Sequence, residues 1–149
     1  MAERTEREVL NHLIETCTDA ARGFRTAADH VTNPTLKGAF MDLAAAREKF
    51  AADLLPHAQR LGGAAAADGT TAAAMHRSWI DLKSKLRHDD AGIVTEAARG
   101  DGVTLHAYKD AVEGMLPPDV RELVERQLAD VSAAHARILG LRTGEPSFK

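Results

Sequence analysis

The sequence predicts an all-α fold in which four long helices form a bundle. Apolar residues recur in alternating steps of three and four along most of the 149-residue chain, as they do in amphipathic helices. Hydrophobic residues make up 44% of the chain and aromatic residues only 4%, so alanine, leucine and valine must supply the core, which favours packed helices over a sheet. Three breaker pairs divide the pattern into segments: Asn33-Pro34, Gly62-Gly63 and Pro117-Pro118.

The first half of the chain predicts an antiparallel helical hairpin. The capping-box pattern from Thr5 to Glu8 opens a helix over residues 5–32. Asn33-Pro34 then supplies an N-cap and a first-turn proline for a second helix over residues 34–61. A joint this short makes the two helices antiparallel neighbours.

The second half predicts three more helical segments. A shorter helix over 71–87 is followed by long helices over 90–114, whose inward stripe reaches Met115, and over 118–141; residues 143–149 are expected to form a flexible tail of the single domain. At about 1.5 Å per residue, the helix over 71–87 is about 25 Å long, enough to return the chain along the bundle. Two antiparallel hairpins joined by a long, partly helical crossover make a ferritin-like arrangement.

Charge and composition exclude several locations and partners. The net charge is −3, from 19 basic and 22 acidic residues, so no overall attraction to nucleic acid or to a membrane surface is expected. The charged start of the sequence lacks the apolar run of a signal peptide, and no stretch approaches the roughly 18 apolar residues of a membrane span. Cys17 is the single cysteine and cannot form an internal disulfide. We therefore expect a cytoplasmic protein.

A set of short motifs is spread over residues 8–142: Leu13-Ile14-Glu15, Gly23-Phe24-Arg25, Ala27-Ala28, Leu61-Gly62-Gly63, His76-Arg77-Ser78-Trp79, Arg99-Gly100 with Tyr108, Pro117-Pro118-Asp119-Val120 and Glu125-Arg126-Gln127. In this combination the chain resembles an uncharacterised bacterial family of ferritin-like four-helix-bundle proteins, a domain of unknown function. Members usually carry an acidic pair after the Arg-Gly motif, whereas here Asp101 is followed by Gly102. The resemblance implies a fold and no established reaction.

The histidine spacing argues against a ferritin-type di-metal centre. Such a centre takes a Glu-x-x-His pair from each of two helices, because this spacing places both ligands on one helical face. None of the seven histidines has a glutamate three residues before it. The nearest substitutes, Glu8/His12 and Asp53/His57, have i, i+4 spacing and lie close to helix ends. We therefore expect no metal and no other cofactor, with a metal site of non-standard ligands as the alternative.

Arg47 and Asp101 are charged residues on otherwise apolar inward stripes. The helices that carry them run parallel in the predicted topology, with midpoints near residues 48 and 102, so the two side chains should lie at the same depth. One interpretation is a buried ion pair at the bundle centre, where a ferritin would hold metal. The other is that both side chains snorkel to the surface.

Three further polar residues belong to the same predicted polar core, which is either an ion-pair site or a ligand site. Gln127 lies one turn from the central layer of the last helix, and His135 flanks its apolar stripe. Tyr108 is expected at the core edge with its hydroxyl hydrogen-bonded. His106 is expected to point outward, and Cys17 to behave as a small buried hydrophobe.

The predicted crossover carries basic residues, among them Arg77, Lys83 and Arg87. They are either an anion-contact strip or a solvated outer face; the acidic balance of the whole chain favours the solvated face and argues against nucleic-acid binding.

Three functions remain. The leading one is a non-enzymatic bundle that acts by binding or self-association, as a homodimer, with a stress role suggested only by analogy to ferritin-like proteins. The alternatives are a metal-binding or oxidase protein with non-standard ligands, and a module that binds a small ligand or nucleic acid.

Overall fold

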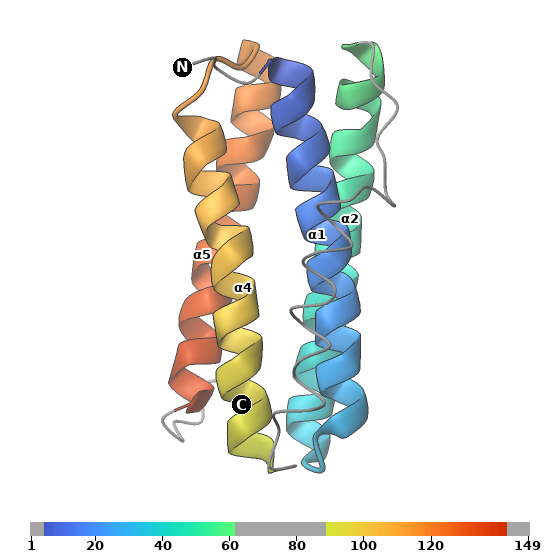
Figure 1. The fold of residues 1–149 in the computed structure, drawn as a ribbon, viewed down its shortest axis with the longest axis vertical. Coiled ribbons are helices and arrows are strands. Elements are labelled where there is room, and N and C mark those ends of the chain that lie inside the picture. Colours follow the sequence, from blue (N-terminus) through green and yellow to red (C-terminus); the bar gives the residue numbers. More distant parts are fainter. Residues whose placement is uncertain (1–4, 62–88, 143–149) are drawn as a thin grey trace.

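The computed structural model describes residues 5–61 and 89–142, and every regular element in these ranges is a helix (Figure 1). The helices are α1 (Glu6–His30), α2 (Pro34–Arg60), α4 (Asp90–Val112) and α5 (Pro118–Arg142). Each boundary lies no more than two residues from the predicted one. The helix expected over 71–87 and the tail expected over 143–149 fall outside the described residues.

The four helices run lengthwise beside one another as a four-helix bundle (Figure 1). α1 and α2 form one antiparallel hairpin, α4 and α5 form another, and α2 and α4 run in the same direction. α1 packs against both α2 and α4, whereas α2 and α5 make the sparsest contact. Asp90 joins the hairpins at one end, since its carboxylate accepts hydrogen bonds from the backbone N–H groups of Thr32 (2.8 Å) and Asn33 (3.0 Å).

Side-chain caps begin the helices where the sequence predicts. Thr5 and Glu8 form the capping box, with reciprocal backbone-to-side-chain hydrogen bonds of 2.8 and 3.1 Å. The Asn33 side chain accepts from the second and third N–H groups of α2, and Asp89 does the equivalent for α4, with an oxygen 2.9 Å from the Gly92 nitrogen. These bonds satisfy donors that a helix leaves unpaired at its start.

The core consists of two apolar clusters stacked along the bundle axis. One surrounds Phe24 and Phe40, and the other surrounds Leu13, Leu54 and Val124. Arg47 and Asp101 lie between the two clusters along their helices, and the other buried polar side chains of the described residues are Thr16, Asp19, Thr104 and Gln127. The bundle therefore has a polar centre enclosed by apolar ends.

Met115 corrects one prediction about the core. It is 78% exposed, although the periodic pattern placed it inward. α4 ends at Val112, so the helical period that placed Met115 on the inward stripe no longer applies. None of the four described helices is both long enough and apolar enough to cross a bilayer.

Candidate functional site

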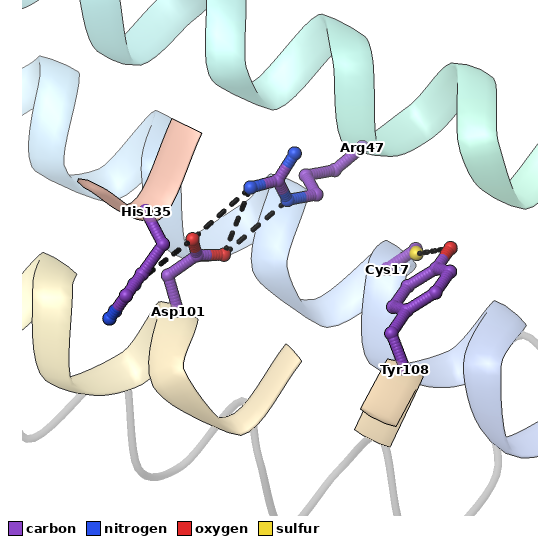
Figure 2. A network of polar contacts seen from close by, with 5 residues as sticks. All are labelled: Cys17, Arg47, Asp101, Tyr108 and His135. Atoms are coloured by element: carbon purple, nitrogen blue, oxygen red, sulfur yellow. Dashed lines mark hydrogen bonds and ion pairs between the residues drawn. The ribbon is translucent and has the colours of Figure 1, made fainter. Parts of the chain in front are cut away.

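The polar centre is built around an ion pair between Arg47 of α2 and Asp101 of α4 (Figure 2). Nη2 of Arg47 lies 3.1 Å from Oδ2 and 3.3 Å from Oδ1 of Asp101, and Nε lies 3.4 Å from Oδ1. The side chains are 1% and 0% exposed, so the structure pairs them in the core and neither snorkels. A guanidinium with two nitrogens on one carboxylate makes the forked pair that arginine geometry favours.

Two aromatic rings hold the guanidinium in place. Its central carbon lies 5.6 Å from the ring centroid of Phe24 on α1 and 5.8 Å from that of Phe50 on α2. Cations at this distance over a ring face are attracted by the ring quadrupole. Arg47 is therefore constrained by its hydrogen bonds to Asp101 and by its contacts with the two rings.

His135 brings α5 into the centre. Its Nδ1 lies 3.6 Å from Oδ2 of Asp101, on the side of the carboxylate away from Cys17 and Tyr108 (Figure 2). The side chain is 15% exposed, so the imidazole lies between the buried carboxylate and the surface. Asp101 thus has the guanidinium of Arg47 on one side and the imidazole of His135 on the other.

Tyr108, about two turns after Asp101 on α4, belongs to a second group of buried polar side chains. Its placement corrects the prediction that it lies at the core edge. The side chain is fully buried rather than at the core edge. Its hydroxyl donates to Oε1 of Gln127 at 2.6 Å, which leaves the Cys17 thiol, 3.1 Å away, to donate to the hydroxyl oxygen. Nε2 of Gln127 in turn lies 3.4 Å from the Phe50 carbonyl oxygen. Cys17, which is expected to behave as a small buried hydrophobe, therefore also has a polar partner.

Burial keeps Cys17 and Tyr108 neutral. It raises the pKa of the Cys17 thiol to about 11, an effect that the hydrogen bond to Tyr108 only partly offsets. Burial likewise raises the pKa of Tyr108 well above its usual value. Nucleophilic chemistry needs the thiolate, so this thiol is poorly suited to it at neutral pH.

Sequence reasoning missed Asp19, a buried carboxyl group on α1. It is 0% exposed, and burial raises its pKa to about 7 against an opposing effect of the Arg22 charge. A usable signal was present, because Thr16, Asp19 and Gly23 follow helical spacing beside the apolar stripe, and all three are buried. The inward face of α1 is wider than its apolar residues indicate.

Asp53 and His57, one of the two candidate metal pairs, each contact another charged residue. Asp53 pairs with Lys49 at 3.2 Å, while His57 lies 4.0 Å from Asp119. His106, expected on the outer face, is 78% exposed and lies 3.2 Å from Asp110. Within residues 5–61 and 89–142, no three histidine, cysteine or acidic side chains are grouped to hold a metal ion.

The bundle centre also does not fit a ferritin-type di-metal group. Arg47 directs two nitrogens at the Asp101 carboxylate, and these would repel a divalent cation from the oxygens it needs. The phenyl rings of Phe24 and Phe50 offer no ligand atom. Arg77, Lys83 and Arg87, the predicted anion contacts, lie outside the described residues.

The sequence matches a family model described as a domain of unknown function (DUF2383) over residues 5–114. The match covers α1, α2 and α4, including Arg47, Asp101 and Tyr108, and ends before α5, which carries Gln127 and His135. No curated protein matches the chain. Because the matched segment is well over half of its length, the chain belongs to the DUF2383 family.

Proposed function

We propose that this protein is a ferritin-like, non-enzymatic bacterial bundle that acts in the cytoplasm by self-association, as a homodimer formed through a groove between α1 and α4. The observation that carries the proposal is the apolar character of this groove, which has a volume of about 540 Å³. Two of its apolar side chains, Val103 and Met115, are 43% and 78% exposed. Its lining residues are Val9, His12, Val103, His106, Ala107, Asp110, Ala111, Glu113, Gly114 and Met115.

The charges along the groove favour a second copy as its occupant. His106 and Asp110 are one helical turn apart on α4 and are 78% and 65% exposed. In an antiparallel α4–α4 contact centred near Tyr108, His106 of each copy would face Asp110 of the other. A two-fold interface is self-complementary in this sense, since residue i contacts residue j and the reverse. Apolar residues beside these charges would supply the buried area.

The buried side chains of the polar centre support a role without catalysis. Asp101 and Tyr108 are fully buried, and the Cys17 thiol stays protonated at neutral pH. A catalytic group has to reach its substrate within hydrogen-bonding distance. The parallel direction of α2 and α4, with two antiparallel hairpins, supports the ferritin-like arrangement (Figure 1).

Solution mass tests the proposal. We expect sedimentation equilibrium to give twice the 16.0 kDa chain mass for the wild type and the chain mass for the double variant Val103→Glu/Met115→Glu. Met41→Glu is the matched control, because Met41 is 46% exposed on α2 and outside the groove, and this variant should remain dimeric. A wild-type monomer at all concentrations, or a double variant that still dimerises, would contradict the proposal.

A further inference from the structure

A second groove lies between α2 and α5, the helix pair with the sparsest contact. Its volume is about 690 Å³. Small and apolar side chains form most of its walls, and three cations and two carboxylates lie along it. The lining residues are Ala39, Asp42, Leu43, Ala46, Arg47, Lys49, Phe50, Asp130, Ala133, Ala134 and Arg137. Arg47 is the member that is almost completely buried, so it lies at the floor.

One nitrogen of the Arg47 guanidinium, Nη1, does not bond to Asp101. Nε and Nη2 both bond to Asp101, and no other described side chain or backbone group bonds to the third nitrogen, Nη1. In Figure 2 this nitrogen points away from the carboxylate of Asp101 and carries no dashed line. Nη1 has two N–H donors of a charged group and is not among the fully buried unpaired atoms, so these donors remain available to a ligand in the groove.

We propose that the groove between α2 and α5 binds a small carboxylate with a short aliphatic chain, whose oxygens accept hydrogen bonds from Nη1 of Arg47. A charge-assisted hydrogen bond would satisfy the remaining donors. The aliphatic part would lie against Ala46, Phe50 and Ala133. This inference is independent of self-association, because the groove between α1 and α4 shares no residue with it.

The surroundings favour a monocarboxylate over a larger or more highly charged anion. Asp101 already balances the charge of Arg47, and the groove carries Asp42 and Asp130 as well as Lys49 and Arg137. A multiply charged anion would therefore meet two carboxylates without a net positive field. A single carboxylate on an apolar chain matches one charged donor at the floor and apolar walls above it.

The guanidinium is also preorganised for this role. Its three hydrogen bonds to Asp101 and its position over the rings of Phe24 and Phe50 hold its plane before any ligand arrives. A ligand would not need to order the arginine side chain, whose freedom is otherwise lost on binding.

The probe is sodium hexanoate, titrated into ¹⁵N-labelled protein at constant ionic strength and followed by NMR. We expect saturable shifts of amides in Ala39–Phe50 and Asp130–Arg137 and of the Arg47 guanidinium, with a dissociation constant on the order of 1 mM for a ligand of this size. Hexan-1-ol has the same chain without the charge and should bind at least about tenfold more weakly.

Groove-filling variants avoid disturbing the ion pair. Ala46→Leu places a larger side chain in the groove, whereas Ala45→Leu changes the neighbouring exposed residue outside it. We expect Ala46→Leu to weaken hexanoate binding at least about tenfold and Ala45→Leu to leave it unchanged. Equal binding by both variants, equal binding of hexan-1-ol, or shifts confined to the groove between α1 and α4 would each overturn the proposal.

Discussion

At the scale of single residues, Arg47 and Asp101 depend on each other. Removing either partner leaves the other charge buried, a situation that costs about 3–5 kcal/mol, whereas replacing both by apolar residues of similar size is often close to neutral. We expect Arg47→Met and Asp101→Leu each to lower the free energy of unfolding by about 3–5 kcal/mol in urea denaturation, and the double variant to recover most of the loss.

The control for this double-mutant cycle is Lys49→Met, two residues from Arg47. Lys49 is 73% exposed and pairs with the carboxylate of Asp53, which is 39% exposed, so its replacement should change the stability by about 0.5 kcal/mol or less. Additive losses in the double variant would show that the pair is not coupled.

Asp19 gives the protein a predictable pH dependence. Its pKa rises from 3.8 to about 7 on folding, so between these values the native state keeps a proton that the unfolded chain releases. Stability therefore falls as the pH rises from about 4 to about 7, and is level above that. We expect Asp19→Asn, which cannot ionise, to gain stability relative to the wild type over this range, by as much as about 4 kcal/mol.

Urea unfolding of the wild type and Asp19→Asn at pH values between about 4 and 8 measures this difference. Asp130→Asn is the control, because it makes the same substitution at an exposed position on α5. A stability difference between Asp19→Asn and the wild type that stays constant across the range would rule out the buried ionisation.

At the scale of helices, the features set by neighbouring residues could be read from the sequence. Thr5, Asn33 and Asp89 cap helices whose starts were predicted within one residue, since a cap needs only the next three N–H groups. The matching depth of Arg47 and Asp101 also followed from helix lengths and direction, because both residues lie near the middle of parallel helices.

The rotation of each helix about its axis could not be read in the same way. Tyr108 was predicted at the core edge, yet the small Cys17 opposite it leaves room for the ring to be fully buried. Asp19 was not singled out from the sequence, because aspartate is rarely buried, but it lies on the wide inward face of α1. Whether such a side chain is buried depends on the side-chain volumes of the helix that faces it, and the sequence pattern of one helix carries no information about them.

At the scale of the whole molecule, the bundle differs from a metal-storing one in what holds its centre together. The two apolar clusters of the core lie on either side of the Arg47–Asp101 ion pair, in which the positive charge is the guanidinium of Arg47. The buried guanidinium of Arg47 supplies next to Asp101 the positive charge that a metal ion would supply to a cluster of carboxylates.

Elemental analysis distinguishes this arrangement from a metal centre with non-standard ligands. We expect protein purified from cultures supplied with iron and manganese to hold well under one ion of either per chain, because Arg47 repels a divalent cation from Asp101. The control is the Arg47→Met variant, which frees the carboxylate beside His135 and should bind at least as much metal as the wild type. Stoichiometric metal in the wild type, lost on replacing Asp101 by Asn, would instead place a metal at the bundle centre.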